Sequence, residues 1–398
     1  MSEKNKSKPI KTADDLRGLS KLAIDATRGI TDLIEAMHHN IARIPGITPS
    51  KEDGRTNGIT GLVYRTVHGV TQAVGTGIDS ALVVLAPYLG NLTDRFEREH
   101  IQSALNGVLG DHLLASNNPL AIHMQLRKNG IPLQLTAEAL SAAIPNATGK
   151  IVVLVHGLCM NDRQWASKRE DGTIHDHGLA LQNEYGFTAV YLHYNTGLAI
   201  SENGLEFSDI LETLIAHWPV AIEEFVIVAH SMGGLVSRSA LYQGEHAGLA
   251  WPKQLNKIIF LGTPHFGAPL ERGGHWFDLL LGATPYAAPF AKIGKIRSAG
   301  ITSLRHGHLI ENQQTAIQMP AGIACFAIAG LVGQANDVLH STHLGDGLVP
   351  LDSALGRHDD PARNLEFPAS HQVVLPATNH MQLLSGAQVY ESIKQFLT

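Results

Sequence analysis

The sequence predicts an α/β fold in which helices cover both faces of a mostly parallel sheet. After residue 119, short apolar runs alternate with helical segments, which is typical of parallel strands joined by crossover helices. Hydrophobic residues make up 44% of the 398 residues and charged residues only 17%, so a large core is expected and disorder is excluded. The net charge of −6 is mild and mixed, which excludes the basic footprint of a nucleic-acid-binding protein.

The first 118 residues are predicted to form a helical region. Apolar residues recur at steps of three and four between Leu16 and Met37, between Ile59 and Leu85, and from Asp94 to Leu113. We expect these helices to pack on a core of their own. Dimerisation and attachment to a membrane surface are alternatives, because the second run is rich in glycine and lets a neighbouring helix or lipid approach closely.

The location signals favour a cytoplasmic protein. The start of the chain lacks a secretory signal, and the longest apolar stretch near it, Ala81–Gly90, is half the length that a membrane span needs. The two cysteines, Cys159 and Cys325, cannot make a disulfide framework. Peripheral membrane contact stays open as an alternative.

The α/β domain is predicted at residues 119–398, after the linker-like stretch Ser116–Pro119. A hairpin is expected first, because apolar runs flank the turn pair Asn129-Gly130. The later strands are predicted at Ile151–Val155, Ala189–Tyr194, Phe225–Val228, Ile258–Leu261, Ile323–Ala329 and Val373–Leu375, with helices near Gly204–His217, Met232–Tyr242 and Met381–Leu397. Functional residues of such sheets gather at the carboxyl ends of the strands.

A serine occupies the carboxyl end of one of these strands. The run from Phe225 to Gly234 leads from an apolar strand through Ser231 into a helical segment, which is the context of a nucleophile elbow. That tight turn tolerates only small neighbours, and Ala229 and Gly233 supply them. Ser231 is therefore the predicted nucleophile, and the alternative is a chance Ser-x-Gly at a strand end.

Acyl transfer also needs backbone N–H groups aimed at the developing oxyanion. The strand Ile151–Val155 is followed by His156-Gly157-Leu158, at the same end of the sheet. Leu158 and Met232, the residue after the nucleophile, are the predicted oxyanion donors. His156 is expected to fix the loop rather than to act as a catalyst.

A base and an acid follow the serine in the chain order Ser, Asp, His. His380 lies after the strand Val373–Leu375, at its carboxyl end, whereas His371 precedes that strand and falls on the opposite rim. His380 is therefore the predicted base. Asp346 is favoured as the acid, with Asp337 as a rival and Asp352 as a more distant one.

Five short motifs together resemble the α/β-hydrolase superfamily. They are Ala-His-Ser-Met-Gly-Gly at 229–234, His-Gly-Leu at 156–158, Gly-Thr-Pro-His-Phe-Gly at 262–267, Asp-Gly-Leu-Val-Pro at 346–350 and Asn-His at 379–380. Within the superfamily they are most similar to bacterial lipases and esterases and to lipase-like inositol deacylases, over about residues 119–398. The resemblance implies an α/β-hydrolase fold and a serine esterase. Its implied triad is Ser231, His380 and Asp346, and its implied oxyanion donors are Leu158 and Met232.

An apolar excursion is predicted at residues 266–322, on the carboxyl rim of the sheet. Aromatic residues are concentrated in 276–290 compared with 6% of the whole chain. We expect a lid or acyl-chain wall here, with Trp276 and Phe277 contacting the substrate. The alternative is a helical insertion that packs on the sheet.

Other candidates are weaker. His340, His343 and Asp346 have residue types that bind zinc, but their spacing is not diagnostic and Asp346 has a better role. Cys159 lies beside the oxyanion loop without a paired base, so it is expected to be a packing residue.

The sequence therefore predicts a carboxylic ester hydrolase that needs no metal or organic cofactor. Its expected partner is a small-molecule or lipid ester, with medium or longer acyl chains, and a homo-oligomer through the N-terminal helices is an open alternative. An acyltransferase or thioesterase with the same triad is the enzymatic rival. A non-catalytic membrane or protein scaffold that works through the N-terminal helices is the rival from another class.

Overall fold

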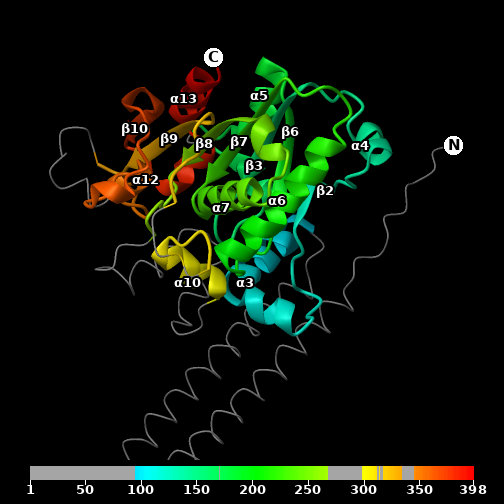
Figure 1. The fold of residues 1–398 in the computed structure, drawn as a ribbon, viewed down its shortest axis with the longest axis horizontal. Helices are drawn as coiled ribbons and strands as arrows, with labels where there is room; N and C mark the ends of the chain where they lie inside the picture. The colour runs from blue at the N-terminus through cyan, green and yellow to red at the C-terminus, as the bar shows by residue number, and fades with distance from the viewer. Residues whose placement is uncertain (1–94, 170, 268–297, 312, 314–316, 334–344) are drawn as a thin grey trace, which may run out of the picture.

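The computed structural model describes residues 95–169, 171–267, 298–311, 313, 317–333 and 345–398 (Figure 1). Within them, an eight-stranded sheet has the order β10-β9-β8-β7-β3-β6-β1-β2. Its strands are β1 (Gln125–Lys128), β2 (Ile131–Pro132), β3 (Lys150–Val155), β6 (Thr188–His193), β7 (Glu224–His230), β8 (Leu255–Leu261), β9 (Ala324–Leu331) and β10 (Gln372–Pro376). Strand β1 is antiparallel to β2 and β6, and the other pairings are parallel.

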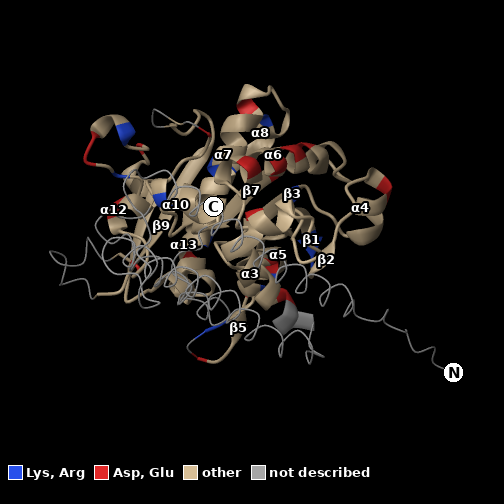
Figure 2. Ribbon diagram, turned by 90° about the horizontal axis from the view of Figure 1, so that it is seen from below, with Lys and Arg blue, Asp and Glu red and all other residues tan. Residues whose placement is uncertain are grey.

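Helices cover both faces of this sheet, as the sequence predicts. The α-helices with described bounds are α3 (Arg95–Ala115), α4 (Ala137–Ala143), α5 (His177–Tyr185), α6 (Ile200–Ala216), α7 (Met232–His246), α8 (Trp251–Gln254), α10 (Ala299–His306), α12 (Leu351–Ala354) and α13 (Ala387–Leu397). Single 3₁₀ turns are η1 (Asp162–Trp165), η4 (Pro361–Arg363), η5 (Ala369–His371) and η6 (His380–Leu384), and a small ribbon joins β4 (Ser167–Lys168) to β5 (Ile174–His175). Acidic residues lie along α6 and on α4, on the outside of the domain (Figure 2).

The sheet divides the interior into two hydrophobic cores, because side chains alternate between its two faces along each strand. In β3, Ile151 and Val153 face one core and Val152 and Leu154 face the other, because successive side chains of a strand point to opposite faces. The first core is shared with α3, α6, α7 and α10, and the second with α5 and α13. All these strand side chains are fully buried. This burial on both faces explains why the strands are short runs of continuous apolar residues.

The predicted strands and the hairpin are confirmed, with small changes of bounds. Asn129 and Gly130 have φ values of 54° and 71°, the left-handed pair that a two-residue hairpin turn requires. The closing segment is not one helix, as we expected from Met381–Leu397. It is divided into η6 and α13, because the backbone leaves the helical conformation at Ser385, with a φ of −145°, and at Gly386, with a ψ of 135°.

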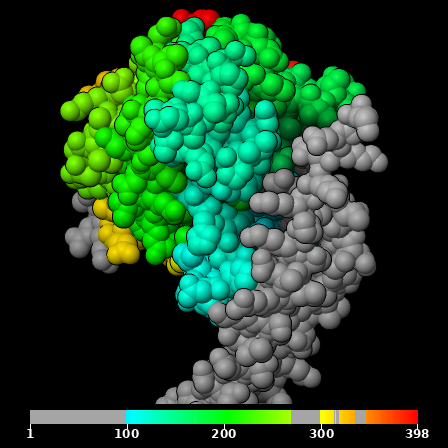
Figure 3. Space-filling model, turned by 90° about the vertical axis from the view of Figure 1, so that its right-hand side faces the viewer, coloured from blue at the N-terminus to red at the C-terminus, as the bar shows by residue number. Residues whose placement is uncertain are grey.

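Helix α3 confirms the third helix predicted before residue 118, but it has no separate core. Its apolar residues belong to the same buried cluster as the sheet. Gly107 and Gly110 allow this, because a Cβ at either position would overlap Cys159 or Asn195. The residues that follow position 95 accordingly form a continuous surface with the rest of the domain (Figure 3). The boundary at residue 118 stays a prediction.

Several sequence predictions lie outside the described residues. They are the helices expected at Leu16–Met37 and Ile59–Leu85, the lid residues Trp276 and Phe277, and the rivals Asp337, His340 and His343. Among the helices that are described, none has both the length and the apolar character needed to cross a bilayer.

Candidate active site

Ser231 occupies a strained turn between β7 and α7. Its φ of 54° and ψ of −125° lie in a region that costs a non-glycine residue about 1–3 kcal/mol. The turn is held because Ser231 N donates to the carbonyl of Leu261, at 2.9 Å, on the adjacent strand β8. A Cβ at Gly233 would lie 2.5 Å from the Val155 carbonyl oxygen, so only glycine lets α7 start this close to β3. The strand–turn–helix context predicted for Ser231 is therefore present.

The loop after β3 meets this turn directly. A Cβ at Gly157 would lie 3.0 Å from the Cβ of Ser231, so backbone and nucleophile are in close contact. Leu158 follows Gly157, and Met232 follows Ser231, and both side chains are buried. The two segments that carry the predicted oxyanion donors thus come together beside Ser231.

Asp346 and His380 form a buried pair. Asp346 Oδ2 accepts a hydrogen bond from His380 Nδ1 at 2.6 Å, and the two side chains are at most 5% exposed. The other carboxylate oxygen, Oδ1, accepts from the backbone N–H groups of Leu348 and Val349 at 3.0 and 2.8 Å. With both oxygens fixed, the carboxylate holds the proton of the ring on Nδ1 and leaves Nε2 as the basic nitrogen. Nε2 has no hydrogen-bond partner within the described residues.

His230 ties this pair to the nucleophile turn. It is the last residue of β7, and its Nε2 donates to the carbonyl oxygen of His380 at 3.1 Å. The two imidazole rings lie 4.6 Å apart. Burial, followed by the nearby His380 ring, holds the pKa of His230 well below its usual value, so this ring stays neutral. Our sequence reasoning missed His230, although a histidine at the end of an apolar strand is a visible signal.

The rival residues lie elsewhere or outside the described residues. His371 precedes β10, at the amino end of the sheet, where its Nδ1 is bonded to the carbonyl of Cys325 at 3.0 Å. Asp352 is exposed on α12. Cys159 is buried, and burial raises the pKa of its thiol to about 12, which suits a packing residue.

His156 fixes the loop, as the sequence predicts. Its ring stacks on Tyr194, with ring centroids 4.5 Å apart, and its backbone carbonyl accepts from the Tyr194 hydroxyl at 2.9 Å. The ring donates from Nδ1 to the carbonyl of Gly157 at 3.0 Å. His156 therefore anchors the start of the loop to β6 and the segment that follows it.

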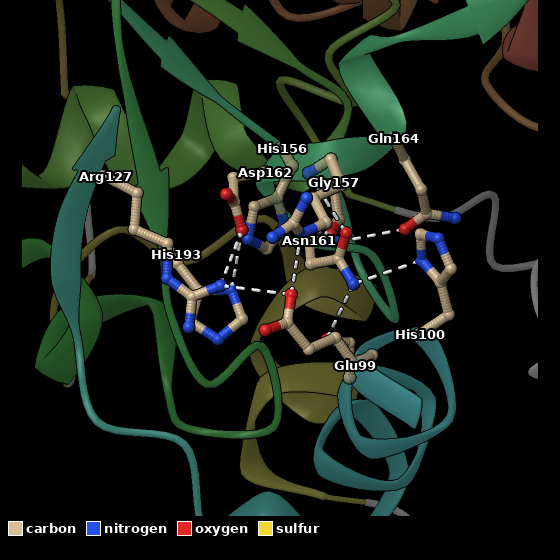
Figure 4. A network of polar contacts seen from close by, with 11 residues as sticks. Glu99, His100, Arg127, His156, Gly157, Asn161, Asp162, Gln164 and His193 are labelled. Carbon is tan, nitrogen blue, oxygen red and sulfur yellow. Dashed lines mark hydrogen bonds and ion pairs between the residues drawn. The ribbon is translucent and has the colours of Figure 1, made fainter. Parts of the chain in front are cut away.

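A buried polar network adjoins the other end of the loop, and the sequence reasoning missed it (Figure 4). Asp162 Oδ1 lies 3.1 Å from both Arg127 Nη1 and His193 Nδ1. Glu99 Oε2 accepts from Arg163 Nε at 2.8 Å. These groups come from α3, β1, β6 and η1, so no local pattern along the sequence could have revealed them.

Buried neutral histidines near the site predict acid sensitivity. Burial lowers the pKa of His156 and of His177, which contacts the carbonyl of Leu383 on η6, to about 3. In an unfolded chain a histidine takes up its proton near pH 6.5, at about its ordinary pKa. Between these values only the unfolded state binds the proton, so the free energy of unfolding rises with pH across this window. Lowering the pH from 7 to 5 is expected to cost about 2 kcal/mol for each such group.

Urea unfolding of wild type and His177→Gln at the two pH values checks this expectation. The loss of stability on acidification should be smaller in the variant by about 2 kcal/mol, because one neutral buried group has been removed. His217→Gln, at an exposed position, is the matched control and should keep the wild-type loss. An equal loss in all three proteins would contradict the assignment.

A family model matches the part of the chain that contains Ser231. Residues 146–324 match the family model described as "PGAP1-like alpha/beta domain". The matched region contains Leu158, Ser231 and Met232 and ends before Asp346 and His380. Together with the sheet topology, the match confirms the predicted resemblance to the α/β-hydrolase superfamily and the α/β-hydrolase-like fold.

Two solved structures of enzymes are similar to part of this chain. The mature form of Bacillus licheniformis lipase BlEst2 is 19% identical over 63% of this chain and 92% of its own, with a TM-score of 0.43. The Pyrococcus furiosus esterase Pf2001 is 14% identical over 63% of this chain and 81% of its own, with a TM-score of 0.38. None of the curated protein sequences matches this chain significantly.

Proposed function

We propose that the chain is a serine carboxylic ester hydrolase that acts through an acyl-enzyme. Ser231 Oγ attacks the acyl carbonyl while His380 Nε2 accepts its proton, and the backbone N–H groups of Leu158 and Met232 donate to the oxyanion. His380 then returns the proton to the leaving alcohol. Water, deprotonated by the same nitrogen, hydrolyses the acyl-enzyme and releases the acid. Asp346 keeps the imidazole in the right tautomer and stabilises the imidazolium.

The Asp346–His380 pair carries this proposal. A buried carboxylate with both oxygens occupied, bound to a histidine at the carboxyl edge of a sheet, is the arrangement that prepares a general base. His230 supports it, because the residue before Ser231 is bonded to the backbone of the base. The family match over 146–324 supports a hydrolase of this class.

Labelling of the full chain with a serine-reactive fluorophosphonate, together with turnover of p-nitrophenyl esters, tests the proposal. We expect stoichiometric labelling at Ser231, located by peptide mass spectrometry, and ester turnover that the label abolishes. Folded protein that neither labels nor turns over esters would reject the proposal and favour a scaffold. Labelling combined with acyl transfer to an added thiol or alcohol in preference to water would identify an acyltransferase.

Medium or longer acyl chains are the proposed substrates, because of the aromatic residues 276–290. If Trp276 and Phe277 contact the acyl chain, they remove its surface from water, which is worth about 25 cal/mol per Å². The double variant Trp276→Ser/Phe277→Ser is therefore expected to lower the ratio of kcat/KM for an octanoate ester to that for acetate about tenfold. Acetate turnover itself should stay within about twofold of wild type, because the reacting groups are untouched.

Leu205→Ser is the matched control for this measurement. Leu205 is 52% exposed on α6, so its removal takes away apolar surface that faces solvent and not the substrate. Its octanoate-to-acetate ratio should equal that of wild type. An unchanged ratio in the folded double variant would make residues 276 and 277 ordinary packing residues and would remove the reason for the long-chain preference.

A further inference from the structure

We propose that helix α3 positions the oxyanion loop for catalysis, and that Glu99, Arg127 and Asp162 are the positioning residues. The oxyanion loop is here residues 156–161, between β3 and η1. The inference rests on the proposed ester hydrolysis and deepens it. It assigns a role in the reaction to a helix that lies outside the predicted catalytic domain and has no catalytic residue of its own.

One face of α3 contacts η1 and the end of the oxyanion loop. Glu99, in its first turns, accepts from Arg163 Nε at 2.8 Å. The next turns are bonded to Asn161, whose Nδ2 lies 3.1 Å from His100 Nδ1 and 3.3 Å from Ser103 Oγ. Positions three and four apart share a helix face, so these contacts come from one side of α3.

The same face continues to the middle of the loop. A Cβ at Gly107 would overlap Cys159 Sγ and would lie 3.0 Å from Cys159 Cα. Cys159 itself has a φ of 59°, which is unfavourable for a non-glycine residue and requires support from its surroundings. The direct neighbour of Leu158, the predicted oxyanion donor, is therefore held against the helix.

Buried charges join the helix, the loop end and the edge of the sheet. Arg127 Nη1 lies 3.1 Å from Asp162 Oδ1 and 3.5 Å from Glu99 Oε2, so this guanidinium bridges two carboxylates (Figure 4). The side chains of Arg127, Asp162 and Glu99 are 9%, 2% and 13% exposed. The carboxylates of Glu99 and Asp162 balance the guanidinium groups of Arg127 and Arg163, and His193 also faces Asp162.

Stability alone is a poor explanation for this network. Buried ion pairs lose the hydration of both charges. A protein in which well-packed apolar residues of similar volume replace such a pair is often equally stable or more stable. Such a network does fix the relative positions of the backbone segments that its hydrogen bonds join. A displacement of about 1 Å in a catalytic group can cost about a hundredfold in rate. The main effect of the network is therefore to fix the position of the backbone N–H of Leu158.

Steady-state kinetics of the full-length variants Glu99→Gln and Asp162→Asn test the proposal. Each is expected to lower kcat about 10-fold to 100-fold while KM changes less than about twofold, because the oxyanion is bound only in the transition state. Glu224→Gln is the matched control. Glu224 makes a single ion pair, 3.0 Å from Lys257 Nζ, at the amino end of the sheet. This pair is more exposed than the network, and its removal should leave kcat unchanged.

A third variant separates positioning from stability. Glu99→Leu/Arg127→Met/Asp162→Leu/Arg163→Met replaces both carboxylates and both guanidinium groups with apolar side chains, and it is expected to unfold at a urea concentration equal to or above that of wild type. The proposal predicts that its kcat nevertheless stays at least about tenfold low. Wild-type kcat in this variant, or in folded Glu99→Gln and Asp162→Asn, would overturn the proposal.

Amide hydrogen exchange tests the same inference without turnover. Exchange within residues 157–161 should be at least about tenfold faster in Glu99→Gln than in wild type or Glu224→Gln, because an unsupported loop opens more often. Unchanged exchange in that segment would overturn the proposal. If wild type shows neither ester turnover nor fluorophosphonate labelling, the proposed function fails, and the exchange result then decides separately whether α3 holds the loop.

Discussion

Ser231→Ala is expected to fold normally and to lose both ester turnover and fluorophosphonate labelling. The substitution removes only the Oγ atom, and this side chain makes no capping bond to α7. Alanine and serine are equally strained at a φ of 54°, so neither the strain energy nor the geometry of the turn should change. Loss of the nucleophile should reduce kcat by about 10⁶-fold, as in serine hydrolases whose triad acts as a unit. Turnover and labelling, with circular dichroism of the folded protein, measure the outcome.

Ser237→Ala provides the matched control. Ser237 is a fully buried serine in α7, the helix that follows Ser231, and its Oγ donates to the carbonyl of Gly233 at 2.8 Å. This variant should keep labelling and most of its turnover. Near-normal turnover of folded Ser231→Ala would remove Ser231 from the mechanism.

Asp346→Asn is expected to lower kcat by about 10⁴-fold with little change in fold. The Asn amide must place its NH₂ group either against the N–H groups of Leu348 and Val349 or against His380. The first option leaves donors facing donors, so the second is favoured. The ring of His380 must then accept at Nδ1 and carry its proton on Nε2, where it can no longer take the proton of Ser231.

Variants of the two rival carboxylates complete this test. Asp352→Asn, at an exposed position on α12, should change kcat less than about twofold, because the carboxylate bonded to His380 is that of Asp346. Asp337→Asn is the second comparison. A larger loss in folded Asp337→Asn than in folded Asp346→Asn would transfer the role of the acid to Asp337.

Local patterns in the sequence predicted the parts of the site that depend on single segments. Ser231 was found because an apolar strand, a tight turn and a helix follow one another within ten residues. His380 was preferred over His371 because a parallel strand separates the two and only its carboxyl end faces Ser231. Each of these inferences depends only on the position and the direction of a single strand.

Pairings between distant segments could not be predicted in this way. The choice of Asp346 over Asp337 stayed open, since only the folded chain shows a carboxylate bonded to His380. Glu99, Arg127 and Asp162 belong to a helix, a strand and a 3₁₀ turn, and their spacing follows no period. The tertiary packing of α3 was missed for the same reason. Gly107 and Gly110 permit the close approach of α3 to Cys159 and Asn195, but only the folded chain shows these partners.

The burial of both cysteines has a practical consequence for spectroscopy. Cys159 and Cys325 are the only thiols in the sequence, and burial raises the pKa of each to about 12. Thiolates are the species that maleimides and spin-label reagents attack, so the native chain presents almost no target at neutral pH. A cysteine introduced at an exposed position can then carry a fluorophore or spin label without prior removal of the native ones. By the same reasoning, inactivation by an alkylating agent would report unfolding of the chain and not a catalytic thiol.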